Sequence, residues 1–198
     1  AYAEGVSHLQ GNEYQQALSA FEKGLQKDSS YVNNLIGKGQ AHQRLDQEEK
    51  ALEAYTRAKN LGEQVGDSES VRRAKDAIRG YYQPRASALL AKSEPGRSDA
   101  RQAIDLMDDM QEHVDPDANT YYYLAAAYNI LGEHERAIEM IDTGLEMHNG
   151  SRTDRARFYF EKGEALRYLG DVAEAKEAYR NAAFGSYKQP AEHFIETL

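Results

Sequence analysis

A residue pattern with a period near 34 constrains the fold of this 198-residue chain more than any other feature of its sequence. Each copy starts at a small residue, has Ala 12 positions later, a large apolar residue 16 positions later and another small residue 19 positions later. A period of this length indicates similar units that bury their apolar faces by stacking on one another. Four copies follow the pattern fully and a fifth follows it weakly, and they begin at Gly5, Gly39, Ala125, Gly163 and, for the weak copy, Ala91.

The apolar residues within a copy recur at the spacing of one face of an α-helix. The second half of the second copy shows this spacing at Ala51, Leu52, Tyr55, Ala58 and Leu61. No segment alternates as a strand would. Because small residues let two helix backbones approach closely while a large side chain fills the space beside them, we predict an all-α chain of paired helices. The alanines that lie 12 positions after the first small residue of a copy should then be buried, and three of them are Ala51, Ala137 and Ala175.

Glycine, Asn or Asp stands where the first helix of each copy should end. The four turns are Gly11-Asn12, Leu45-Asp46, Leu131-Gly132 and Leu169-Gly170-Asp171. Together with the small and large positions, these turns resemble the tetratricopeptide repeat over nearly the whole chain. The resemblance implies a right-handed α-solenoid of about five helix-turn-helix repeats in a single domain, with a concave face that binds partners. The implied repeats span about 1–31, 32–65, 84–117, 118–151 and 156–189.

The third copy departs from the pattern and follows an insertion. It has Ser87 where a large residue is usual and Glu94 where an aromatic residue is usual, so its packing is the least well defined. About 18 extra residues precede it, and segment 66–83 has apolar residues at helical spacing. We predict an extra inserted helix between repeats two and three. A long first helix of repeat three, interrupted near Gly80 and Pro84, is the alternative.

The last residues, 190–198, follow the fifth repeat. Pro190 stands where a helix could start, and Phe194, Ile195 and Leu198 could form an apolar stripe along it. We therefore predict a short C-terminal capping helix that covers the apolar face of the last repeat.

Charge is distributed unevenly along the chain. The formal net charge is −9 at pH 7, yet the segment from Arg72 to Arg101 has eight basic and three acidic residues. This segment could bind an acidic partner or RNA. The favoured interpretation is a solvated helix face that acidic neighbours neutralise. The negative charge of the whole chain argues against nucleic-acid binding, because neutralisation of the phosphate backbone dominates such affinity.

The residues and spacings of known catalytic and metal sites are missing from this sequence. With no cysteine, disulfides, zinc-thiolate sites and thiol nucleophiles are excluded. His134-Glu135 begins like a zinc-protease motif, but Ile138 stands where the second histidine is needed. His8 and His42 fall at the same point of successive repeats and are interpreted as packing residues. We therefore predict no enzymatic activity, no cofactor and no metal.

The resemblance also implies which residues line the concave groove. In this family, partners contact a stripe of each first helix next to the buried stripe. The residues of this sequence at those positions are Tyr2, Val6, Ile36, Gln40, Gln43, Tyr122, Ala126, Asn129, Phe160, Glu164 and Arg167. Tyr122 and Phe160 are the expected aromatic anchors, since Tyr and Phe flanked by polar residues are typical of recognition surfaces. The alternative is a purely structural role, in which these two rings only pack against neighbouring helices.

We predict a non-enzymatic scaffold or adaptor that binds an extended peptide or a partner's helix in its groove. RNA or an acidic partner on the basic segment is one alternative. A second is an accessory subunit of a cell-envelope or multiprotein assembly that self-associates through its terminal repeats. The composition fits the cytoplasm and the bacterial periplasm equally, and the start at Ala1 is compatible with a removed signal peptide or lipid anchor. No apolar stretch is long enough to span a membrane.

Overall fold

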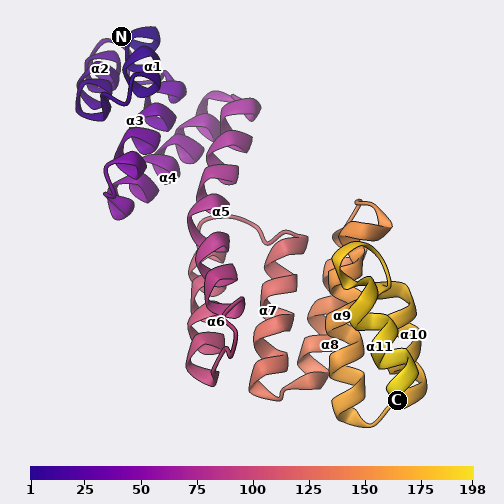
Figure 1. The fold of residues 1–198 in the computed structure, drawn as a ribbon. Coiled ribbons are helices and arrows are strands. Elements are labelled where there is room, and N and C mark those ends of the chain that lie inside the picture. The colour runs from indigo at the N-terminus through magenta and orange to yellow at the C-terminus, as the bar shows by residue number, and fades with distance from the viewer. The chain divides into compact units, whose positions relative to one another are not determined.

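The computed structural model describes residues 1–198, and all of its regular secondary structure is helical (Figure 1). It has eleven α-helices and one 3₁₀ turn, η1 (Gly185–Tyr187). The α-helices are α1 (Tyr2–Gln10), α2 (Tyr14–Lys27), α3 (Val32–Arg44), α4 (Glu48–Val65), α5 (Ser68–Leu90), α6 (Arg97–Gln111), α7 (Ala118–Leu131), α8 (His134–Met147), α9 (Arg152–Leu169), α10 (Val172–Ala182) and α11 (Lys188–Thr197).

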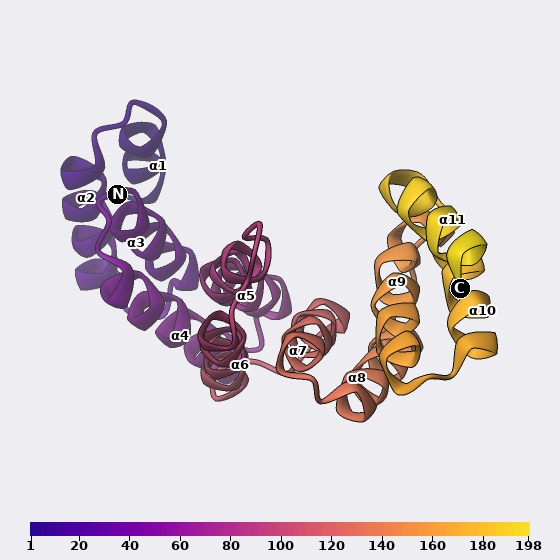
Figure 2. The same cartoon turned by 60° about the horizontal axis from the view of Figure 1, so that its bottom comes forward.

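The chain forms two compact units, residues 1–81 and 82–198, and α5 contains the division between them. In the first unit, α1 to α4 pack against one another in sequence. In the second unit, α6 to α10 do the same and α11 packs against α10, as Figures 1 and 2 show. The predicted all-α arrangement of packed helix pairs is confirmed within each unit.

The contacts inside each pair explain the spacing of 16 residues between a small and a large residue. A Cβ atom placed on Gly39 would lie 2.4 Å from the Tyr55 ring, and one on Gly163 would lie 2.6 Å from the Tyr179 ring. The backbone of the first helix therefore lies directly against an aromatic ring of the second helix. The alanines predicted to be buried are fully inaccessible to solvent, and these are Ala51, Ala137 and Ala175.

Four helix pairs share one turn geometry. In each turn a backbone N–H donates to the carbonyl five residues earlier, as Glu13 does to His8 at 2.8 Å. This hydrogen bond is typical of a helix end that contains a residue in the left-handed conformation. The left-handed residues have φ of 58°, 55°, 79° and 88° and are, in that order, Asn12, Asp46, Gly132 and Gly170. The sequence positions of these turns were thus identified correctly, with Asn and Asp replacing Gly in the first two repeats.

The segment predicted as an insertion is helical, but it is not a separate helix. It forms part of α5, which continues through Gly80 and Pro84 without interruption. The structure thus has the alternative, one long helix that leads into repeat three, but without the expected interruption near Gly80 and Pro84. The reason is an unbroken apolar stripe along α5, since buried residues recur every four positions at Ala74, Ile78, Tyr82 and Ala86. Burial of this stripe outweighs the local cost of one exposed proline.

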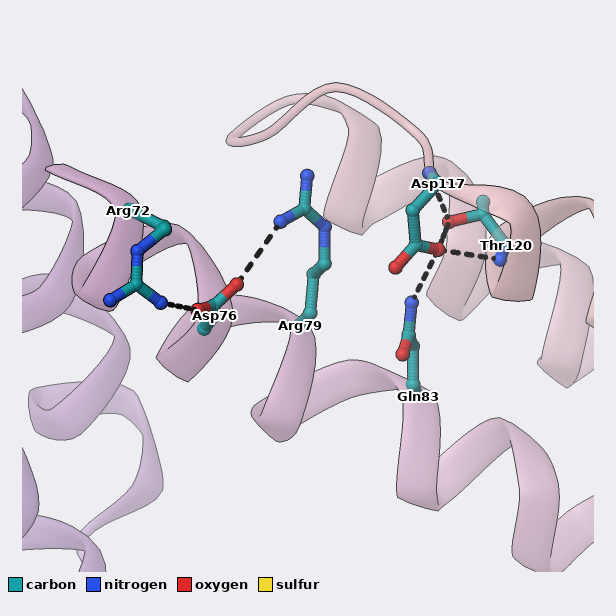
Figure 3. Close-up of polar contacts among 6 residues, drawn as sticks. All are labelled: Arg72, Asp76, Arg79, Gln83, Asp117 and Thr120. Carbon is teal, nitrogen blue, oxygen red and sulfur yellow. Dashed lines mark hydrogen bonds and ion pairs between the residues drawn. The ribbon is translucent and has the colours of Figure 1, made fainter. Parts of the chain in front are cut away.

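Much of the basic segment is paired within the chain. The Asp76 carboxylate lies between Arg72 and Arg79, at 3.2 Å and 3.5 Å from their guanidinium nitrogens (Figure 3). Lys92 pairs with Asp99 further along the segment. These contacts support the interpretation of a helix face that acidic neighbours neutralise.

Asp117 organises the start of α7. Its Oδ1 atom accepts hydrogen bonds from the Thr120 backbone N–H at 2.9 Å and from the Gln83 amide at 2.8 Å (Figure 3). The first bond caps α7, because it provides an acceptor for an N–H that has no partner inside the helix. The second bond joins α7 to the last turns of α5, which also belong to the second unit.

The C-terminal helix covers the last helix pair, as predicted. Ala191 is fully buried, and Phe194 and Ile195 pack against the core cluster of α9 and α10. The rings of Phe194 and Tyr179 stack with their centroids 4.9 Å apart. Every helix of the chain is too short or too polar to cross a membrane.

Candidate functional site

The second unit contains a groove with a volume of about 680 Å³. Its walls come from the end of α5 and the loop that follows, from one face of α7 and from one face of α9. Four aromatic rings line it, together with two carboxylates and one side-chain amide. These residues are Tyr122, Tyr123, Phe160, Tyr168, Glu161, Glu164 and Asn129. The rest of the wall is small or apolar and consists of Ser87, Leu90, Ala91, Ser93, Pro95, Ala126 and Ile130.

Tyr122 and Phe160 line the groove but are also fixed in the core. The Tyr122 ring lies edge-on to the Phe158 ring, with the centroids 5.5 Å apart. Burial raises the pKa of the Tyr122 hydroxyl above its ordinary value, and the nearby Glu161 carboxylate adds to the rise. Phe160 contacts the rings of Tyr179 at 5.6 Å and Phe194 at 6.1 Å. Both predicted anchors therefore act first as supports of the groove wall.

Tyr168 is the groove ring most available to a ligand, because 63% of its surface is exposed. Its ring is nevertheless held in place, because it stacks on the His134 ring with a centroid distance of 4.9 Å and an interplanar angle of 3°. The Arg167 guanidinium also lies over the Tyr168 ring, 4.4 Å from its centroid. A ring held in place in this way loses little conformational entropy when a ligand contacts it.

The two carboxylates of the groove have different surroundings. Glu164 accepts a hydrogen bond from an Arg167 guanidinium nitrogen at 2.8 Å and another from the Tyr179 hydroxyl. Its negative charge is thus balanced by Arg167. Glu161 has no ion-pair partner, and its Oε2 atom accepts a hydrogen bond from the Asn129 amide at 2.9 Å. Burial raises the pKa of the Glu161 carboxyl, the Asn129 bond lowers it, and repulsion from Glu164 raises it further.

Asn129 connects the two helices that form the groove walls. Its amide nitrogen also donates to the Glu161 backbone carbonyl at 3.0 Å, so α7 and α9 are joined by two bonds from one group. Its Oδ1 atom lies 3.2 Å from Nδ1 of His134. Because that oxygen only accepts hydrogen bonds, this contact requires a proton on Nδ1 of His134. These bonds fix the position of the Glu161 side chain.

The structure brings together most of the groove residues predicted from repeats four and five. Those that line the groove are Tyr122, Ala126, Asn129, Phe160 and Glu164. Arg167 instead pairs with Glu164 beside the groove.

The residues predicted from repeats one and two lie in the first unit, where three of them face its interior. Ile36 is only 2% exposed, so its side chain belongs to the core. Tyr2 and Val6 are half-buried against the cluster around Phe21. Gln40 and Gln43 are exposed, and Gln43 accepts a hydrogen bond from the Tyr55 hydroxyl at 3.1 Å.

Sequence reasoning did not identify Tyr123, Glu161 and Tyr168 as groove residues, although the structure places all three there. Each lies one position further along the chain than a residue that was identified. The available signal was helical spacing, because Glu161, Glu164 and Tyr168 are three and four residues apart and share one face of α9. The groove stripe is therefore wider than the one that the resemblance implies.

A smaller cavity of about 400 Å³ lies between α9 and α10. Three arginines line it with Tyr159, Asn181 and Phe184, and they are Arg152, Arg155 and Arg180. No acidic residue lines this cavity. The chain has no group of three or more side chains placed to hold a metal ion.

These features define a class of protein, the helical-repeat proteins that are built from stacked helix pairs. The comparisons with known proteins narrow this class. A model of the tetratricopeptide repeat family matches residues 156–183. A TPR repeat-containing protein of Methanocaldococcus jannaschii is 33% identical over 75 residues, which is 38% of this chain and 12% of the length of that protein.

Two solved structures are similar in fold. MamA has 17% sequence identity and a TM-score of 0.48, over 91% of this chain and 86% of MamA. A thermophilic TPR protein of Thermus thermophilus has 18% sequence identity and a TM-score of 0.43, over 97% of this chain and 95% of the Thermus chain. These matches in sequence confirm the resemblance of the chain to the tetratricopeptide repeat family. Proteins of this family are generally scaffolds for protein–protein interactions and are typically non-enzymatic.

Proposed function

We propose that the groove of the second unit binds an extended segment of a partner protein, and that this chain acts as a scaffold or adaptor. The observation that carries the proposal is the exposed Tyr168 ring at a groove lined by three further aromatic rings. Exposed aromatic residues beside polar groups are the side chains that most often dominate binding energy at protein interfaces.

The mixed lining of the groove, with aromatic rings and polar groups, suits an extended segment. An extended chain directs alternate side chains into such a groove and leaves the others in solvent. Asn129 and the two carboxylates then provide polar contacts between the rings.

The proposal is tested by selecting random peptides from a phage-displayed library on the wild-type protein. Selected peptides are measured by isothermal titration calorimetry against Tyr168→Ala and Val172→Ala. Val172 is a matched control, because it is an exposed apolar residue, 41% accessible, that does not line the groove. Tyr168 was chosen over Tyr122 and Phe160 because its removal leaves the core contacts of α9 intact.

We expect Tyr168→Ala to weaken binding by about 1 to 3 kcal/mol, and Val172→Ala to leave it unchanged. Circular dichroism of both variants should match that of the wild type. The proposal fails if the selected peptides bind Tyr168→Ala as tightly as the wild type, or if no peptide is enriched over a library without the protein.

A further inference from the structure

The polar groups in the groove wall are acidic or neutral. Among the residues that line it, Glu161 and Glu164 are acidic, Asn129 is an amide, and there is no lysine, arginine or histidine. The ionisable carboxyl groups of Glu161 and Glu164 are therefore the main source of charge in the lining itself. Such a groove complements a positively charged ligand and repels a carboxylate or a phosphate.

The two acidic residues do not contribute equally to this charge. Arg167 already pairs with Glu164, as its guanidinium donates to the carboxylate at 2.8 Å. The Glu161 carboxylate is hydrogen-bonded only to the neutral amide of Asn129 and has no counter-cation. It is also half-buried, so water solvates it incompletely. An ionised carboxylate in these surroundings is destabilised unless a cation approaches it.

The aromatic rings complete a site for a long basic side chain. Lysine and arginine have aliphatic stems that pack on apolar surfaces while their charged ends reach a polar partner. Tyr168 and Tyr123 line the same groove as Glu161 and can provide that apolar surface. The electron-rich ring of Tyr123 also attracts a cation.

We propose that the partner segment in this groove carries a lysine or arginine side chain, whose charged end pairs with Glu161 while its stem packs on the aromatic wall. This inference rests on the proposed function, and it specifies the chemistry of the partner. An acidic or wholly apolar segment would leave the Glu161 charge without a cation and would bind less tightly.

The inference is tested by nuclear magnetic resonance titrations with three small probes. N-acetyl-lysine methylamide and N-acetyl-arginine methylamide carry the charge, and N-acetyl-norleucine methylamide is a neutral probe of similar shape. Backbone amide shifts of Asn129, Ile130 and Glu161 report occupancy of the groove. Titrations use the wild type, Glu161→Gln and Glu177→Gln. Glu177 is a matched control, because it is an acid on α10 outside the groove.

We expect both cationic probes to bind the wild type about ten-fold more tightly than the norleucine probe, as a hydrogen bond to a charged group allows. Glu161→Gln keeps the shape of the side chain and its bond to Asn129, and it should reduce the affinity for lysine to that for norleucine. Glu177→Gln should have no effect.

Equal affinity for the lysine and norleucine probes would overturn the inference, as would unchanged lysine binding by Glu161→Gln. Absence of saturable shifts with the cationic probes would also count against it. These failures are distinct from a failure of the proposed function. Norleucine binding in the groove, or selected peptides that depend on Tyr168, would support an aromatic peptide site without a role for charge.

Discussion

The contact between Gly163 and Tyr179 offers a quantitative test of how the repeats pack. In a Gly163→Ala variant, the new Cβ atom would lie 2.6, 2.7 and 2.8 Å from three atoms of the Tyr179 ring. Ordinary carbon–carbon contacts are about 3.5–4.0 Å, so the ring or the helix must move by about 1 Å. The ring is fully buried, stacks on Phe194 and donates its hydroxyl proton to Glu164. It therefore has no free space to move into.

Two opposing effects set the size of the change. Overpacking of a close-packed core costs about 1–3 kcal/mol. Alanine has a higher helix propensity than glycine, which stabilises the folded state by about 1 kcal/mol. We expect a net loss of up to about 2 kcal/mol in the free energy of unfolding, measured by urea denaturation with far-ultraviolet circular dichroism. Gly80→Ala is the control, because Gly80 is an exposed helical glycine with no atom within 4 Å of its added Cβ. That variant should be stabilised by about 0.5–1 kcal/mol.

Repeat four supplies a second background, because it has Ala125 and Ile141 where repeat five has Gly163 and Tyr179. In a Tyr179→Ile variant, the further change Gly163→Ala should therefore cost nothing or stabilise. A double-mutant cycle measures the difference between the two backgrounds. If Gly163→Ala has the same effect in both, or stabilises the wild type as Gly80→Ala does, the close contact does not explain the spacing of 16 residues.

Three further variants test other parts of the structure. Because the pKa of the Glu161 carboxyl is raised, this group stays protonated in the folded protein at pH values above the ordinary 4.5, where it has lost its proton in the unfolded chain. The contribution of Glu161 to stability therefore falls as the pH rises through that range. The stability advantage of Glu161→Gln over the wild type should therefore grow with pH in urea titrations, and a pH-independent difference would contradict this. Phe194→Ala should cost about 1–3 kcal/mol of unfolding free energy through lost packing on Tyr179, and Phe194→Leu should cost less. Gly170→Ala should lower the thermal unfolding midpoint, since a φ of 88° costs an alanine about 1–2 kcal/mol, while no change would show that the turn relaxes.

The helix pairs could be predicted because their defining contacts lie within a single repeat. Gly39 and Tyr55 are 16 residues apart and touch across one turn, and the same contact recurs between Gly163 and Tyr179. A contact that repeats at constant separation leaves a periodic trace in the sequence. The turns leave the same trace, through residues that tolerate positive φ.

The continuity of α5 could not be predicted from its local residues. Gly80 and Pro84 are both helix breakers by propensity, and they suggested a boundary. The buried stripe from Ala74 to Ala86 passes through them without a change of register. Tertiary burial therefore decides the outcome, and it depends on neighbours that a search for helix breakers does not consider.

The groove was only partly predictable, because it depends on contacts between repeats. Asn129 and Glu161 are 32 residues apart, and their hydrogen bond joins α7 to α9. No periodic pattern encodes that bond, since the equivalent residues of the other repeats differ. The stripe implied by the family resemblance therefore included Arg167, whereas the next residue, Tyr168, lines the groove.

The residues that line the groove have two different roles, support of the groove wall and exposure to a ligand. The rings of Tyr122 and Phe160 contact other aromatic rings of the core, so their removal would damage the groove wall itself. Tyr168 and Glu161 have fewer such contacts, and each has a property that the folded chain alone does not require. One is a large exposed ring, and the other is a half-buried carboxylate without a cation. Because both features cost stability in an empty groove and both complement a basic side chain, binding accounts for them better than folding does.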